Sequence, residues 1–157
     1  MGNIQKLIIS IVGCELVGIG ASIFTLTAIP TWYSSLTKPS FSPPNWIFGP
    51  VWTTLYFLMG VSAFLIWKKG LKSKKVKRAL LFFLFQLFFN FLWSILFFGL
   101  HNPLLGLLDI LLLLVSIIVT LITFYKISKT ATYLLIPYLI WVSFATILNF
   151  SLIVLNP

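Results

Sequence analysis

Five long apolar segments alternate with short polar connections along this chain. The segments cover approximately residues 4–27, 46–67, 76–100, 103–125 and 131–155. Each is long enough to cross the hydrocarbon core of a bilayer as a helix, which takes about 20 mostly apolar residues. The pattern predicts an all-α integral membrane protein, a five-transmembrane-helix bundle in which residues 1–157 form a single domain. The first segment is too long for the core of a signal peptide, so we expect it to remain as a helix.

The composition indicates that lipid, and not water, surrounds most of this chain. Hydrophobic residues make up 60% of the chain and charged residues 8%, whereas a soluble domain carries about 25% charged residues. The net charge of +9 does not indicate nucleic-acid binding, because the basic residues form short clusters between apolar segments, as in the loops of membrane proteins. We expect the lipid bilayer to be a partner of this chain and nucleic acid not to be one.

The same basic residues predict an orientation in the membrane. An odd number of spans places the two termini on opposite faces. One face carries every basic residue except Lys38, namely Lys6, Lys68, Lys69, Lys72, Lys74, Lys75, Lys77, Arg78, Lys126 and Lys129. By the positive-inside rule this face, with the N-terminus, is cytoplasmic, and the C-terminus lies outside. A composition rich in Lys, Phe and Ile suggests a prokaryotic cell membrane.

Both acidic residues of the chain, Glu15 and Asp109, lie inside predicted helices. Ionisable groups are costly at that depth, which makes each a candidate for function. Gly18 and Ser22 share a face with Glu15, at spacings of three and seven residues. One interpretation is a proton or ion relay. The other, which we favour because no lysine or arginine lies inside the membrane, is an acid turned inward to hydrogen-bond neighbouring helices.

Three predicted helices each carry an aromatic stripe at helical spacing. The stripes consist of Phe48, Trp52 and Tyr56 in the second helix, of Gln86, Asn90, Trp93 and Phe97 in the third, and of Pro137, Trp141, Ala145 and Asn149 in the fifth. Such stripes fit either the lining of a ligand pocket or close packing between helices, and spacing alone does not separate the two. A tryptophan near a helix end is often only an interfacial anchor, which suits Trp67 and in part Trp46.

Motifs of common enzyme and metal sites are missing from the sequence. It contains no phosphate-binding Gly-rich loop, no HExxH and no Ser-His-acid set in a plausible order. Cys14 is the only cysteine and His101 the only histidine, so we expect no metal site and no required cofactor. His101 could serve as an axial ligand of a metalloporphyrin, but a histidine in a turn is more often simply polar.

The stretch WYSSLTKPSFSPPNWIFGPVWTTLYFLMG, residues 32–60, is the most distinctive of the chain. Together with Pro30 it holds five of the eight prolines and three of the six tryptophans. Proline stiffens a connection and aromatic rings form flat walls, as at the rim of a pocket for a flat apolar ligand. The stretch closely resembles the second-helix signature of the TspO/MBR family of translocator and tryptophan-rich sensory proteins. The stretches QLFFNFLWSILFFG (86–99), LLDILLL (107–113) and PYLIWVSFATILN (137–149) are similar to the signatures of its third, fourth and fifth helices.

The resemblance implies a five-helix bundle, usually a homodimer, with a pocket closed by the loop between the first two helices. It implies binding of porphyrins such as protoporphyrin IX and of synthetic benzodiazepine-type ligands. By motif position, the ligand-binding residues are Trp32, Tyr33, Pro43, Phe48, Trp52, Tyr56, Asn90, Trp93, Trp141, Ala145 and Asn149. Trp52 and Trp141 match a pair proposed to act in porphyrin oxidation, so they are catalytic only if this protein degrades porphyrin.

We therefore expect a translocator-like or receptor-like membrane protein that binds tetrapyrroles (protoporphyrin IX, haem-type) and related flat apolar ligands, for sensing or transport. The alternative is a light- and oxygen-dependent porphyrin-degrading enzyme that uses the pocket tryptophans. No broken helix with paired half-segments is visible, which disfavours a transporter. A scaffold for other membrane proteins also stays open. The C-terminal stretch NFSLIVLNP lacks the arginine of the sterol motif of animal members, so sterol binding there is not expected.

Overall fold

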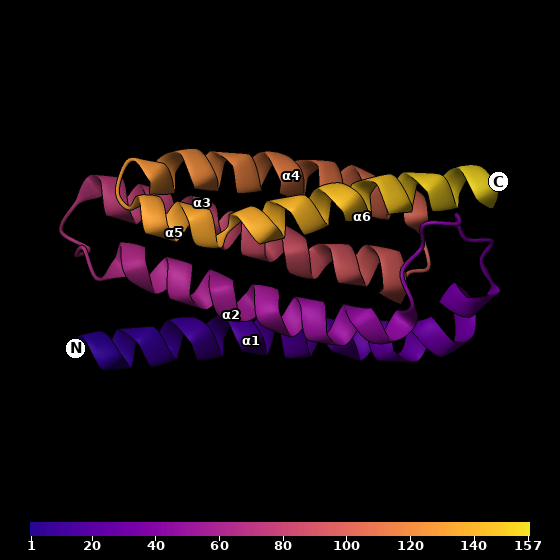
Figure 1. Ribbon diagram of the computed structural model, residues 1–157, viewed down its shortest axis with the longest axis horizontal. Coiled ribbons are helices and arrows are strands. Elements are labelled where there is room, and N and C mark those ends of the chain that lie inside the picture. Colours follow the sequence, from indigo (N-terminus) through magenta and orange to yellow (C-terminus); the bar gives the residue numbers. More distant parts are fainter.

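A computed structural model describes all residues, 1–157, as a bundle of helices that run side by side along one axis (Figure 1). The helices are α1 (Asn3–Ala28), α2 (Phe48–Trp67), α3 (Lys74–Ser94), α4 (Pro103–Tyr125), α5 (Lys129–Leu134) and α6 (Ile136–Leu155). With their short extensions they give five segments of 23 to 31 residues that are long and apolar enough to cross a membrane. The predicted five-span, all-α architecture is therefore confirmed. The two termini lie at opposite ends of the bundle (Figure 1).

The first span is longer than predicted, because the helix does not stop before Pro30. It continues from α1 into a π-helical turn, η1 (Ile29–Tyr33). A proline inside a helix removes one hydrogen-bond donor and crowds the carbonyl four residues earlier, and a wider π-helical turn relieves that conflict. A 3-10 turn, η2 (Asn45–Ile47), precedes α2. The connection expected over residues 28–45 is therefore irregular only over residues 36–44.

The third span also ends in a π-helical turn, and the fifth span is interrupted. η3 (Ile95–Gly99) follows α3 directly. In the fifth span α5 and α6 meet at Leu135, where we expected one continuous helix (Figure 1). Pro137 stands in the first turn of α6, where a missing donor is tolerated. Because α5 has 6 residues and α6 has 20, this break does not form the paired half-helices typical of transporters.

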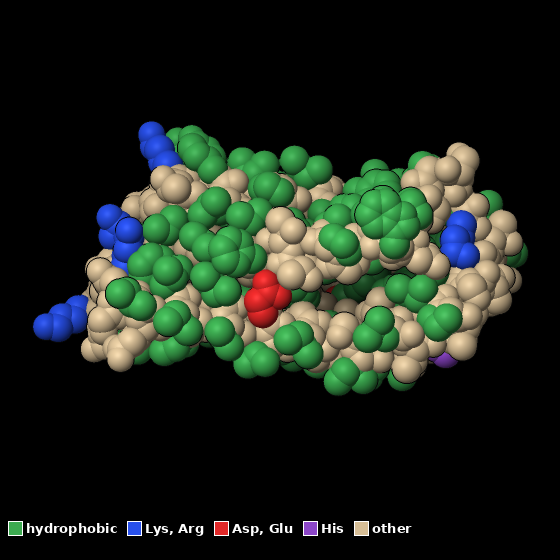
Figure 2. All heavy atoms as spheres, turned by 60° about the horizontal axis from the view of Figure 1, so that its bottom comes forward, with side chains coloured by type: hydrophobic (Ala, Val, Ile, Leu, Met, Phe, Trp, Pro, Cys, Tyr) green, Lys and Arg blue, Asp and Glu red, His purple; other side chains and the backbone are tan.

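The two ends of the bundle differ in charge (Figure 2). One end, here called the basic end, holds the N-terminus and the connections at residues 68–73 and 126–128, with all basic residues except Lys38. The connection before the third span is shorter than expected, because α3 begins at Lys74 and not at about residue 76. The opposite end, here called the loop end, holds residues 36–44, the turn at His101 and the C-terminus.

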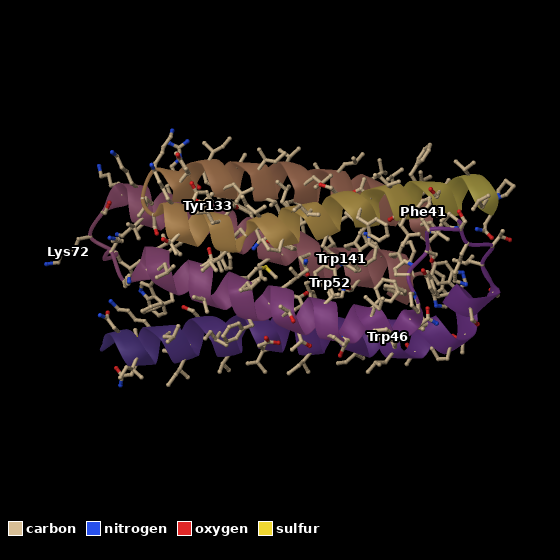
Figure 3. All side chains as sticks on the ribbon, viewed as in Figure 1. Phe41, Trp46, Trp52, Lys72, Tyr133 and Trp141 are labelled. Atoms are coloured by element: carbon tan, nitrogen blue, oxygen red, sulfur yellow. The ribbon has the colours of Figure 1, made fainter.

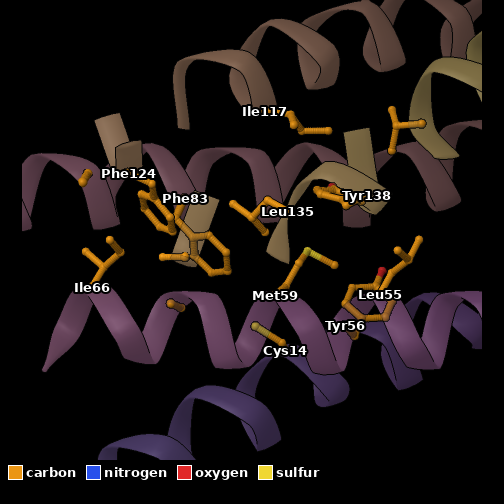
Figure 4. Close-up of a cluster of buried hydrophobic side chains, with 14 of the residues drawn as sticks. Cys14, Leu55, Tyr56, Met59, Ile66, Phe83, Ile117, Phe124, Leu135 and Tyr138 are labelled. Atoms are coloured by element: carbon orange, nitrogen blue, oxygen red, sulfur yellow. The ribbon is translucent and has the colours of Figure 1, made fainter. Parts of the chain in front are cut away.

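A continuous apolar core fills the space between α2, α3, α4 and the α5–α6 span (Figure 4). Met59, Ile66 and Phe124 have no exposed surface, and Phe83 has 3%. In contrast, α1 packs on this core from one side only. Of its 26 residues, three small ones are buried, namely Cys14, Ala21 and Ala28. Most of the surface of α1 is therefore exposed on the outside of the bundle.

Gly60 marks the closest contact between α1 and α2. A Cβ atom at this position would lie 2.5 Å from the Cα atom of Ile11, so only glycine fits against the backbone of α1. Toward the loop end, the next close approach is that of Gly18 on α1 to the ring of Tyr56 on α2, and beyond it the two helices diverge. The space that opens between them is the candidate site.

Candidate ligand-binding site

A cavity of about 400 Å³, here called the main cavity, lies between α1, α2 and α3 in the half of the bundle nearer the loop end. It reaches the lipid-facing surface, because three of its lining residues, Ile19, Leu26 and Trp46, are 60 to 73% exposed. Figure 2 shows the hollow on this face, with an acidic side chain at one end of it. The other lining residues are Glu15, Gly18, Ala21, Ser22, Thr25, Ile29, Asn45, Phe48, Gly49, Trp52, Thr53, Tyr56, Asn90, Trp93 and Ser94.

The predicted stripes of α2 and α3 meet in the main cavity. Phe48, Trp52 and Tyr56, four residues apart on α2, line one wall, and Asn90 and Trp93 on α3 line another. The indole of Trp52 lies 5.6 Å from the ring of Tyr56 between centroids. Five of the eleven residues expected to bind ligand are thus brought together here.

The stripe of α6 faces a different space. Trp141, Ala145 and Asn149 line a second cavity of about 30 Å³, together with Tyr33 from η1. Phe48 and Trp93 line both cavities and form the wall between them. The ring of Phe48 packs edge to face on Trp141, at 6.1 Å between centroids. The second cavity has room for about one or two water molecules, so no macrocycle fits there unless these rings move.

Trp52 and Trp141, the pair that would act together in porphyrin oxidation, are consequently separated by ring packing. Both point into the space between α2 and α6 (Figure 3). Trp52 lines the main cavity, whereas Trp141 lines only the second one, behind Phe48. A ligand in the main cavity would contact Trp52 but not Trp141 in this arrangement.

Two residues of the expected ligand set, Trp32 and Pro43, line neither cavity. The indole of Trp32 stacks on the imidazole of His101, at 4.7 Å between centroids and 9° between planes. His101 adopts a positive φ of 53°, and the next residue, Asn102, caps α4 by accepting a hydrogen bond from the Leu105 amide. This contact ties η1 to the turn before α4. Trp32 and His101 therefore brace the loop end instead of facing the main cavity.

A buried chain of hydrogen bonds runs from the wall of the main cavity across the bundle. The Tyr56 hydroxyl donates to Oδ1 of Asn90, and Nδ2 of Asn90 donates to the Tyr138 hydroxyl at 2.9 Å. The Tyr138 hydroxyl donates in turn to Oε1 of Gln86 at 2.7 Å. All four side chains are at most 4% exposed. Because each hydroxyl donates in a fixed direction, the network holds the Asn90 carboxamide in one orientation at the cavity wall.

Gln86 and Tyr138 were not among the expected site residues, although their positions contained a signal. Gln86 precedes Asn90 by one helical turn on the same stripe, and Tyr138 follows Pro137 directly. A buried amide needs partners, so the stripe itself indicated that a phenol or amide from another helix would face it.

Asn149 is also engaged within the protein. Its Oδ1 accepts a hydrogen bond from Nε1 of Trp93 at 3.2 Å, and its Nδ2 donates to the Pro103 carbonyl at 2.8 Å. Both ends of the carboxamide thus have protein partners. Asn149 fixes the indole of Trp93 as part of the wall between the cavities.

The face of α1 in the main cavity was missed as a ligand-binding surface. Glu15, Gly18, Ser22 and Thr25 lie on it at spacings of three or four residues. Gly18 is required there, because a Cβ atom would lie 2.5 Å from the ring of Tyr56. The spacing of the first three was visible in the sequence, but nothing in it indicated which helix this face would meet.

The two acids have different surroundings, and neither hydrogen-bonds a neighbouring helix as we expected. Asp109 is 4% exposed within the bundle, and neither of its carboxylate oxygens has a hydrogen-bond partner. Glu15 is half-buried and lines the main cavity, without a hydrogen bond or a charged partner in the chain. The expectation of inward hydrogen bonding was therefore wrong for both. Only Glu15 is placed to meet a ligand.

The loop over the end of the bundle is fastened by Asn156, the residue after α6. Its Oδ1 accepts a hydrogen bond from the Thr37 amide at 2.8 Å, and its Nδ2 donates to the Thr37 carbonyl at 2.9 Å. Phe41 from the same loop packs against Phe144 of α6 at 6.2 Å between centroids (Figure 3). The loop is thus held against α6.

Comparison with known proteins agrees with the motifs. The model of the TspO/MBR family matches residues 10–155. A tryptophan-rich protein TspO from Archaeoglobus fulgidus is 48% identical, over 98% of this chain and 99% of the relative. The human translocator protein is 41% identical over 76% of this chain and 71% of its own length. A tryptophan-rich sensory protein from Cereibacter sphaeroides is 37% identical over 80% of this chain and 77% of its own length. This chain therefore belongs to the TspO/MBR family.

Proposed function

We propose that this protein binds a tetrapyrrole such as protoporphyrin IX, or a similarly flat apolar ligand, in the main cavity. The observation that supports this most directly is the convergence of Phe48, Trp52 and Trp93 around one space. Flat aromatic side chains stack on a broad apolar ring system, and the cavity volume of about 400 Å³ falls within the range of about 300–1,000 Å³ that is usual for ligand sites.

The open side of the main cavity suits a ligand that partitions into lipid. Ile19, Leu26 and Trp46 form its rim on the lipid-facing surface. A ligand dissolved in the bilayer reaches such a cavity without passing through water, and part of a macrocycle can protrude from it into the hydrocarbon. The polar groups of a tetrapyrrole would lie toward the loop end, where the Asn45 carboxamide supplies a donor and the Thr25 hydroxyl, which donates to the Ala21 carbonyl, can accept.

Binding fits the structure better than porphyrin degradation by a tryptophan pair. Degradation of that kind needs both Trp52 and Trp141 at the ligand, and Phe48 stands between the main cavity and Trp141. We therefore propose that Trp52 stacks on the ligand and that Trp141 packs behind the wall formed by Phe48 and Trp93. Binding of this kind requires no cofactor.

Sensing and transport both agree with a binding site of this kind, and the names of the relatives point to each. Flux of protoporphyrin through sealed vesicles separates the two, because a sensor binds without flux. We further propose a homodimer in a prokaryotic cell membrane, with the basic end cytoplasmic and the C-terminus outside. Labelling of cysteines introduced at Lys72 and Ser40 in intact cells tests this orientation.

The test of ligand binding is quenching of tryptophan fluorescence by protoporphyrin IX, with protein in lipid nanodiscs. We expect Trp52→Phe to weaken binding, because an indole that stacks on the ligand is lost. Trp141→Phe should change the affinity little. Trp67→Phe is the matched control, because Trp67 lies near the basic end, outside the main cavity. If Trp52→Phe and Trp67→Phe leave the affinity equally unchanged, the ligand does not bind in the main cavity.

A further inference from the structure

Glu15 lies near the middle of the first membrane span, Asn3–Tyr33, and contributes the only formal charge among the residues that line the main cavity. It stands 12 residues after the start of α1 at Asn3, which places it about 18 Å along the helix from that end. The other charged side chain that α1 contributes, Lys6, is nine residues away, or about 14 Å along the axis. Glu15 therefore has no basic partner on its own helix, and it forms no ion pair with another part of the chain.

A carboxylate at this depth is costly, and membrane proteins usually pair such a group or turn it toward a water-filled or ligand-filled space. Glu15 has no hydrogen bond and no ion pair, and the space it borders is the main cavity. Asp109 offers a contrast, because it is enclosed in the bundle and lines neither cavity. The carboxylate of Glu15 is therefore placed to interact with a ligand in the main cavity.

We propose that Glu15 is the specificity-determining residue of the main cavity, selecting flat amphipathic ligands that carry a cationic amine and disfavouring those that carry a carboxylate at the same depth. This inference rests on the proposed function in one respect, namely that the main cavity holds flat ring systems. Opposite charges attract strongly where little water screens them, and two carboxylates repel for the same reason. A ligand with carboxylates on one edge only, such as a tetrapyrrole, binds with that edge toward the loop end, away from Glu15.

Three probes with the same ring system test the selection: pyrenemethylamine, which is cationic, pyrenemethanol, which is neutral, and pyrenecarboxylic acid, which is anionic. Binding is measured by energy transfer from tryptophan to pyrene, with protein in nanodiscs of zwitterionic phosphatidylcholine. Nanodiscs without protein correct for partition of each probe into lipid. The wild-type protein should bind the amine about tenfold more tightly than the alcohol, and the carboxylic acid most weakly.

Glu15→Gln keeps the shape of the side chain and removes its charge. We expect it to bring the ratio of amine to alcohol affinity to about one and to strengthen binding of the carboxylic acid. Glu15→Asp, which retains the charge on a shorter side chain, should keep part of the preference. Ser22→Ala, a neutral change in the same cavity, should keep all of it.

The same variants are titrated with protoporphyrin IX, so that two failures are distinguishable. If protoporphyrin binds but the ratio of amine to alcohol affinity is the same in wild type and Glu15→Gln, the role of Glu15 is refuted and the proposed function stands. If the amine preference depends on Glu15 but protoporphyrin does not bind, the role of Glu15 stands and tetrapyrrole binding is refuted. Absence of binding by all three pyrenes refutes the selection as well.

Discussion

Gly49 and Gly60 lie on the same helix, eleven residues apart, and their surroundings are opposite. At Gly60 a Cβ atom would lie 2.5 Å from the backbone of α1, whereas at Gly49 it would meet no atom within 4 Å. Gly60 sits where α1 and α2 touch, and Gly49 lines the main cavity. The main cavity therefore arises where α1 and α2, which are in contact at Gly60, diverge toward the loop end.

The two halves of the bundle also differ in what fills them. In the basic half, the core between the helices is apolar, as around Ile66, Phe83 and Phe124. In the half toward the loop end, the carboxamide of Asn90 and the phenols of Tyr56 and Tyr138 form a buried network beside the main cavity. Apolar contacts thus dominate between the helices of the basic half, and directional hydrogen bonds define the wall of the main cavity in the other half.

The largest effect is expected from filling the contact at Gly60. Gly60→Leu forces a side chain against the backbone of Ile11, which cannot move aside as a flexible side chain could. We expect the free energy of unfolding to fall by about 3 kcal/mol, at the upper end of overpacking effects. Thermal unfolding in detergent, followed by circular dichroism, measures it. Gly49→Leu is the control and should leave the melting temperature nearly unchanged. Equal losses of stability in the two variants would contradict the difference in packing between Gly60 and Gly49.

Removal of the network's central residue should have the next largest effect. Asn90→Leu leaves the Tyr56 hydroxyl without its acceptor and the Tyr138 hydroxyl without its donor, so we expect a loss of about 2 kcal/mol in the free energy of unfolding. Ser94→Ala is the control, because Ser94 lies one turn along on α3 and also lines the main cavity. Thermal unfolding again measures the change in stability. If Asn90→Leu and Ser94→Ala lowered the free energy of unfolding by equal, small amounts, the network would have no structural importance.

Filling the main cavity should weaken ligand binding without loss of stability. Gly49→Leu places a side chain in open space, so we expect the protoporphyrin affinity to fall by about tenfold, which corresponds to about 1.4 kcal/mol. Fluorescence titration measures it. Gly13→Leu is the matched control, since a Cβ there also meets no atom within 4 Å but Gly13 borders a separate groove in the basic half. Equal losses in both variants would place the ligand elsewhere.

The smallest effect on stability is expected at the clamp between Asn156 and the loop. Asn156→Ala removes two hydrogen bonds to Thr37 at the exposed end of the bundle, and we expect a change of about 0.5–1 kcal/mol. Hydrogen exchange of the Thr37 amide should nevertheless become much faster, because its acceptor is lost. Ser151→Ala, whose hydroxyl bonds only within α6, should leave this exchange unchanged. Unchanged exchange in Asn156→Ala would show that the loop is held by other contacts.

Hydrophobic length was enough to predict the five spans, whereas the family and five of the residues that line the main cavity were predicted from the resemblance of sequence motifs to the TspO/MBR family. A run of about 20 apolar residues has one stable solution in lipid, and helical periodicity assigns each residue to a face. Backbone adjustments at prolines were harder to predict. Pro30 is accommodated by a π-helical turn and Pro137 coincides with a break, although both follow apolar helical segments.

The sequence by itself determined which residues share a face of a helix, and the distribution of charge between the two ends. Only the tertiary structure decided which faces meet and how far apart they stand. It placed Trp141 behind Phe48, gave Asn90 its partners on α2 and α6, and turned Glu15 toward an open space. The physical reason is that periodicity fixes direction around a helix axis, whereas the distance between helices depends on contacts such as that of Gly60 with Ile11.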